Sequence, residues 1–106
     1  TDHGVSTIIG ENVGVGHLAL IHGATIGDGC LIGMGAKLLN NSVIGAGAFV
    51  AASALVLEGQ QVEPGHLVAG LPAKDRGPMG EEMAERVRSN AFHYQELAAQ
   101  YRASGM

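Results

Sequence analysis

The fold of this chain is decided by residues 26–68, which read IGDGCLIGMGAKLLNNSVIGAGAFVAASALVLEGQQVEPGHLV. An aliphatic residue returns at every sixth position of this stretch, without a gap. These residues are Ile26, Ile32, Leu38, Ile44, Val50, Val56, Val62 and Val68. A strict period of six matches neither the 3.6-residue period of a helix nor the 2-residue period of a strand.

Small residues follow the aliphatic ones at a fixed distance of four positions: Cys30, Ala36, Ser42, Ala48 and Ala54. The two series together predict a prism, in which short extended segments point one aliphatic side chain inward and a small residue lets the chain turn the corner. Stacked coils pair their backbone groups with the coils above and below. At about 18 residues per coil, residues 8–70 make roughly three and a half coils of a parallel β-helix.

The repeat extends upstream through Ile9, Val15 and Ile21, but the step from Ile21 to Ile26 is five residues long. One coil is therefore short by a residue. The first coil is also expected to present an unpaired strand edge, because nothing before Ile8 resembles a cap. Either another chain covers this edge or this chain lacks N-terminal coils of its solenoid, and we favour the second interpretation.

Length and composition exclude several classes of function and partner. The chain has 106 residues, which suits one domain, and six Lys+Arg against ten Asp+Glu give a net charge of −4. This balance argues against a nucleic-acid partner. A single cysteine excludes an internal disulfide framework and indicates a reducing compartment, so we expect a cytoplasmic protein. No apolar run approaches the roughly 20 residues that cross a bilayer, so no membrane partner is expected.

The repeat ends near Gly70, and a second pattern begins at Glu81. Residues 1–70 are predicted to form the β-helix, residues 71–80 an irregular linker, and residues 81–104 a C-terminal α-helix. Apolar residues recur along this last segment at steps of three and four, as in Met83, Val87 and Ala91. Such a helix has to lie along the coil stack or along a neighbouring subunit.

Two histidines, His17 and His22, lie at the short step of the repeat. Departures from local regularity concentrate at functional sites. Each histidine comes within two residues of an inward aliphatic residue, so its side chain is expected at a corner or on the outside. Outward side chains on different prism faces diverge, so the two rings of one chain cannot easily share a metal. Our hypothesis is a metal site between subunits; the alternative is that both are ordinary surface histidines.

The sequence resembles the γ-class carbonic anhydrases and their bacterial relatives. The resemblance is carried by Gly16-His17, by Ile21-His22-Gly23, by Ile32-Gly33-Met34-Gly35, and by the segments 70–74 and 90–94. It implies a left-handed parallel β-helix that assembles as a homotrimer. It also implies reversible hydration of CO2 to bicarbonate, a lyase reaction in which a metal-bound hydroxide attacks CO2.

The same resemblance implies a Zn²⁺ ion, or Fe²⁺ or Co²⁺, held by three histidines at each subunit interface. His17 matches the ligand donated across the interface, and His22 matches the ligand of the home subunit. The family's third histidine aligns immediately before Thr1, and His3 is the candidate to replace it. Asn90 and Tyr94 match helix residues near a neighbour's active site, although Tyr94 would equally serve to pack the helix on the solenoid.

Two other classes of function remain open. One is a non-catalytic trimeric scaffold that keeps the fold and binds a metal. The other is a hexapeptide acyltransferase that uses coenzyme A, although such enzymes usually carry more coils and longer loops. The missing third histidine leaves open whether this chain is itself active, and the identity of the metal stays undetermined.

Overall fold

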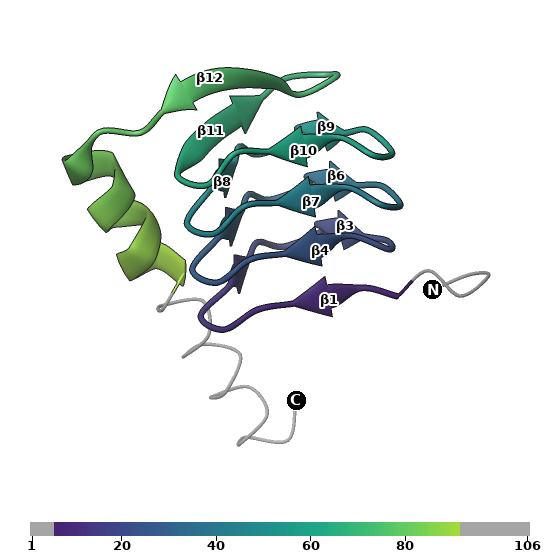
Figure 1. The fold of residues 1–106 in the computed structure, drawn as a ribbon, viewed down its shortest axis with the longest axis horizontal. Helices are drawn as coiled ribbons and strands as arrows, with labels where there is room; N and C mark the ends of the chain where they lie inside the picture. The colour runs from purple at the N-terminus through teal and green to yellow at the C-terminus, as the bar shows by residue number, and fades with distance from the viewer. Residues whose placement is uncertain (1–5, 92–106) are drawn as a thin grey trace.

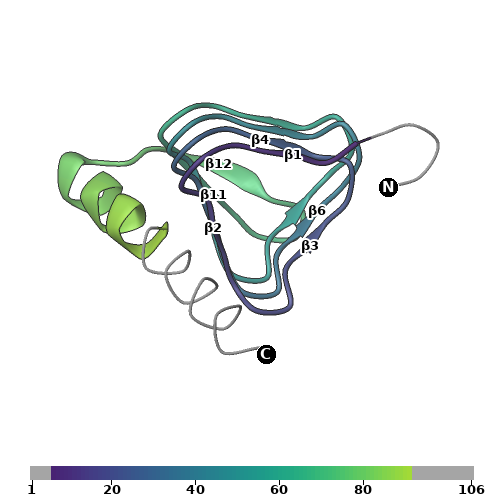
Figure 2. The ribbon, with the colours of Figure 1, turned by 90° about the horizontal axis from the view of Figure 1, so that it is seen from below.

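The computed structural model describes residues 6–91 of the chain. Three sheets of short strands form the sides of a triangular prism (Figure 2). The first side contains β1 (Ile8–Ile9), β4 (Thr25–Ile26), β7 (Val43–Ile44) and β10 (Gln61–Val62). The second contains β2 (Gly14–Val15), β5 (Leu31–Ile32), β8 (Phe49–Val50), β11 (His66–Ala69) and β12 (Lys74–Pro78). The third contains β3 (Leu20–Ile21), β6 (Lys37–Leu38) and β9 (Leu55–Val56).

Strands of successive coils pair in parallel, one above the other, which confirms the predicted β-helix (Figure 1). Thr25 pairs with Val43 and Val43 with Gln61, so these coils are 18 residues long. Ile8 pairs with Thr25, which makes the first coil one residue shorter. The five-residue step of the sequence is therefore absorbed within the first coil.

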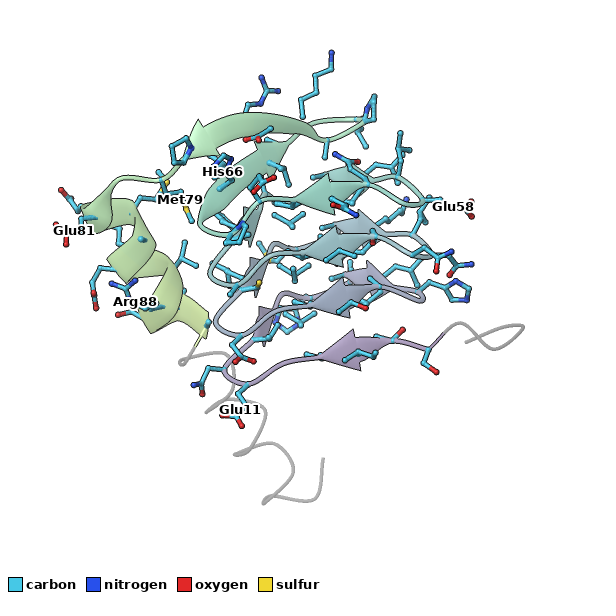
Figure 3. The ribbon with its side chains drawn as sticks, viewed as in Figure 1. Glu11, Glu58, His66, Met79, Glu81 and Arg88 are labelled. Atoms are coloured by element: carbon cyan, nitrogen blue, oxygen red, sulfur yellow. The ribbon has the colours of Figure 1, made fainter. Side chains whose placement is uncertain are left out.

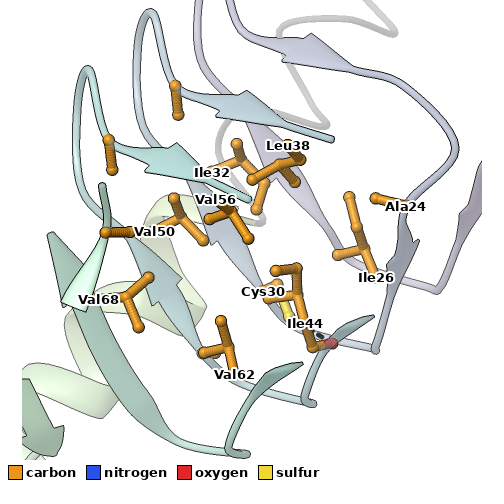
Figure 4. Packing of buried hydrophobic residues seen from close by; sticks show 14 of the residues in the cluster. Ala24, Ile26, Cys30, Ile32, Leu38, Ile44, Val50, Val56, Val62 and Val68 are labelled. Atoms are coloured by element: carbon orange, nitrogen blue, oxygen red, sulfur yellow. Dashed lines mark hydrogen bonds between the residues drawn. The ribbon is translucent and has the colours of Figure 1, made fainter. Parts of the chain in front are cut away.

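The interior of the prism is the column of aliphatic residues that the repeat predicts (Figure 4). All eight residues from Ile26 to Val68 in that series are buried, as are the five small residues that follow them. The first coil differs, because its inward residue Ile9 is 49% exposed. Among the described coils, the first thus covers its inward position least.

The top of the prism is closed by β12, which pairs antiparallel with β11. Residues 71–80 were expected to be an irregular linker, and this expectation is wrong for Lys74–Pro78. The strand contains Lys74, Asp75, Gly77 and Pro78, residue types that are depleted in strands, and it forms because β11 offers it a partner edge. Exposed charges on this last strand protect it from further pairing.

A helix follows at residues 81–91 and continues to the end of the described chain. It begins after Gly80, whose carbonyl accepts the amide of Ala84 at 2.9 Å. The helix runs beside the side of the prism that contains β2 and β11 (Figures 1 and 2). Val87 and Ala91 are buried, and so is Leu31 on the outer face of that sheet. Within residues 6–91, no helix is long and apolar enough to cross a bilayer.

Candidate metal site

His17 lies at the corner between the second and third sides, which we call the His17 corner (residues 16–19, 33–36 and 51–54 of three successive coils). Its carbonyl accepts the amide of Gly35 in the coil above, at 2.9 Å, and its side chain is exposed. The preceding Gly16 is required by close packing, because a Cβ there would lie 2.7 Å from the backbone nitrogen of Met34. The Gly-His pair of the sequence thus places an imidazole at the edge of the prism.

His22 lies at the next corner, which we call the His22 corner (residues 22–24, 39–42 and 57–60). Its amide donates to the carbonyl of Leu38 at 3.0 Å, and its side chain is half-buried. Gly23 follows with φ +70°, a left-handed conformation that favours glycine, and its amide donates to Thr7 Oγ1 at 2.9 Å. The His-Gly pair therefore reflects the turn at this corner.

The two histidines stand at opposite ends of one side of the prism, separated by β3. Each was expected at a corner or on the outside, and the structure places both at corners. Within residues 6–91, no group of three or more His, Cys, Asp or Glu side chains lies close enough to hold a metal ion. The donor chemistry suits Zn²⁺, because neutral imidazole is a usual zinc ligand. One described chain alone does not bring enough ligands together.

Of the other predicted site residues, Asn90 is the one that the structure describes. Asn90 is exposed on the helix. His3 and Tyr94 lie outside the described residues, so their roles stay predictions. Glu58 projects from the His22 corner of the third complete coil and is exposed (Figure 3).

A polar pair that the sequence did not suggest lies at the cap. His66 begins β11, and its Nδ1 lies 2.9 Å from Asp75 Oδ1 on β12. The amide of Gly77 donates to the same carboxylate oxygen at 2.7 Å. This hydrogen bond, followed by the one with His66, holds the pKa of Asp75 below its ordinary value. The pair links β12 to β11. It lies more than 40 residues along the chain from His17 and His22 and belongs to the cap.

Cys30 is buried in the prism, where its Sγ donates to the carbonyl of Gly45 at 3.0 Å. Burial raises the pKa of this thiol, which keeps it protonated at neutral pH. Cys30 is therefore a core residue and no nucleophile, as the repeat predicts.

Residues 6–40 and 23–58 match the family model described as bacterial transferase hexapeptide (six repeats). These ranges together cover half of the chain, and the chain belongs to this hexapeptide-repeat family. Among curated proteins, it is 38% identical over 97 residues to the mitochondrial Gamma carbonic anhydrase 1 of Arabidopsis thaliana, covering 92% of this chain and 35% of that protein. It is 40% identical over 97 residues to Protein YrdA of Escherichia coli, covering 92% of this chain and 53% of that protein.

Solved structures with the same fold include a hexapeptide transferase family protein from Anaplasma phagocytophilum. Its TM-score is 0.82 at 35% identity, over 90% of this chain and 57% of that one. A serine acetyltransferase from Brucella abortus, solved with coenzyme A, has a TM-score of 0.64 at 32% identity, over 70% of this chain and 32% of that one. The chain spans between a third and about half of the length of the curated relatives named above.

Proposed function

We propose that the protein is a metal-dependent hydratase of the γ-carbonic anhydrase type, which interconverts CO2 and bicarbonate at the interfaces of a homotrimer. The observation that carries this proposal is the placement of His17 and His22 at the two ends of one prism side. In a threefold assembly of prisms, the His17 corner of one subunit meets the His22 corner of the next. Similarity to proteins named gamma carbonic anhydrase supports the same function.

In this arrangement His17 and His22 hold the cation, which is Zn²⁺ or, in its place, Fe²⁺ or Co²⁺. A bound divalent cation supplies Lewis-acid activation of water. The chain's own contribution is positional, because the backbone of each histidine is fixed by a hydrogen bond to the coil above. His3, or a histidine of a longer chain, is the proposed third ligand, and Asn90 and Tyr94 are proposed to reach a neighbour's site.

We also place the protein in the cytoplasm. The support for this is the single cysteine of the chain, Cys30, which is free and buried and fits a reducing compartment.

A complementation experiment tests the shared site. Two inactive variants, His17→Ala and His22→Ala, are co-expressed in equal amounts with different tags, and mixed oligomers are purified. If each site takes His17 from one subunit and His22 from its neighbour, every mixed trimer has one intact site of its three, so the purified mixture regains about a third of the wild-type sites. Bound zinc per chain and CO2 hydration are measured, with His66→Ala as a histidine control that leaves both unchanged.

Three outcomes contradict the proposal. A mixture with no zinc above the single variants means that both ligands belong to one subunit. If the wild-type protein sediments as a monomer, there is no subunit interface at which the proposed site could form. Zinc binding without hydration, in a chain that carries all three histidines, favours the non-catalytic scaffold.

The second candidate is a coenzyme A-dependent acyltransferase, since the serine acetyltransferase of similar fold was solved with coenzyme A. The corners among residues 6–70 are short, however, and carry no extended loop that could cover a pantetheine arm. Titration with coenzyme A separates the two functions. Saturable binding together with acetyl transfer would support the acyltransferase.

A further inference from the structure

The first coil is one residue shorter than the coils above it, and the difference lies at the His22 corner. Three residues, 22–24, connect β3 to β4, whereas four residues, 39–42, connect β6 to β7 directly above. The strands on both sides of the corner are in parallel register, Ile21 with Leu38 and Thr25 with Val43. The upper corner therefore carries one residue more than the corner it covers.

Asn40 lies in this longer upper corner, one coil above His22. Its carboxamide oxygen Oδ1 is inaccessible to solvent and has no hydrogen-bond partner. It is the one side-chain oxygen or nitrogen in this state among the described residues. Leaving a buried acceptor unpaired costs about 1–3 kcal/mol, so an unpaired oxygen beside a proposed site needs an explanation.

The neighbouring polar groups of the corner are already engaged. The Ser42 hydroxyl donates to the carbonyl of Leu39 at 2.7 Å, and Gln60 Nε2 donates to the carbonyl of Ala73 at 2.9 Å. The amide of Asn41 donates to the carbonyl of Gly23 at 2.9 Å. Coils are spaced by about 4.8 Å, a distance that an imidazole and a carboxamide span together by side-chain rotation.

We propose that Asn40 is a positioning residue for His22: its Oδ1 accepts the N–H of the His22 imidazole when the ring binds a cation. This inference rests on the proposed function. A histidine that binds a metal through one nitrogen usually donates the other N–H to an oxygen, which fixes the tautomer and the ring orientation. Asn40 supplies that oxygen from the coil above, and the buried position of Oδ1 keeps water from competing for it.

The experiment compares zinc affinity and the His22 tautomer in four proteins: wild type, Asn40→Ala, Asn40→Asp and Asn41→Gly. Loss of such an outer oxygen typically weakens metal binding 10- to 100-fold. We expect a loss in that range for Asn40→Ala and retention in Asn40→Asp, whose carboxylate also accepts a hydrogen bond. Asn41→Gly is the matched control at the same corner, because Asn41 is exposed with φ +64° and glycine adopts this conformation freely.

The tautomer is read from the ¹⁵N chemical shifts of the His22 ring, assigned by its absence in His22→Ala. We expect one tautomer in zinc-bound wild type and a mixture in Asn40→Ala. Unchanged zinc affinity and an unchanged tautomer in folded Asn40→Ala would overturn the role of Asn40. Failure of wild type to bind zinc would instead overturn the proposed function, and the role of Asn40 with it, because the hydrogen bond is proposed for the metal-bound ring.

Discussion

Ile9 pairs with Ile26 in parallel register, yet Ile9 is 49% exposed and Ile26 only 1%. The two residues hold the same inward position in adjacent coils. What differs is coverage, because Ile26 has a coil on both sides and Ile9 has a described coil on one side only. The aliphatic column therefore continues to the surface at the first coil.

Truncating these two isoleucines is expected to have unequal effects. Ile26→Ala removes fully buried atoms and leaves a cavity, which costs about 2–5 kcal/mol. Ile9→Ala removes atoms that are half in water and should cost about half as much or less. Urea unfolding of both variants measures the difference. Equal losses would mean that another surface covers Ile9 in solution.

Gly16→Ala is expected to destabilise the chain by about 1–3 kcal/mol, as overpacking does. The added Cβ would lie 2.7 Å from the Met34 nitrogen, and backbone cannot move aside cheaply. Gly59→Asn is the control, because Gly59 has open space and φ +72°, a conformation that Asn41 adopts in the coil below. Thermal unfolding should separate the two variants, and equal melting temperatures would contradict the close approach.

Leu18 is expected to be replaceable with a gain in stability. Its φ is +63° and its side chain is 92% exposed. The left-handed backbone therefore costs free energy, and no burial of the side chain within the same chain offsets that cost. A left-handed conformation costs an ordinary residue roughly 1–2 kcal/mol, and asparagine tolerates it. Leu18→Asn should therefore raise the unfolding free energy of the dissociated chain by about 1 kcal/mol.

Leu20→Asn is the contrasting variant, because Leu20 is similarly apolar and half-exposed but lies in β3 without a positive φ. It should lose stability, since asparagine is a poor strand residue. Dilution series with chemical denaturation keep association separate from folding. A loss of stability in the dissociated Leu18→Asn chain would show that Leu18 is not strained.

Asp75 is expected to make stability depend on pH in the acid range. Its pKa is lowered, first by the Gly77 amide and then by His66. A lowered folded pKa means that the stabilisation is complete above the ordinary aspartate pKa of about 3.9 and is lost as the pH falls through the folded value. The difference in unfolding free energy between wild type and Asp75→Asn should be constant near neutral pH and shrink in acid. A constant difference across this window would show that the carboxylate gains nothing on folding.

The sequence predicted the core because every six residues one side chain must point inward, and Ile26, Leu38 and Val56 do so. It also predicted that His17 and His22 lie at corners or point outward, and both lie at corners. It could not reveal β12, since Lys74 and Asp75 have no strand preference and the strand depends on the partner edge of β11. The unpaired oxygen of Asn40 was equally invisible, because it follows from how two unequal corners stack.

The corner glycines have a consequence for how this chain tolerates change. At Gly16, Gly27, Gly33 and Gly45, a Cβ would lie within 2.7 Å of backbone in the next coil. Every other amino acid carries that carbon, so no missense change at these positions is conservative, however small the new residue. Amino-acid substitutions in this solenoid are therefore expected to be excluded from the positions where the backbones of successive coils touch.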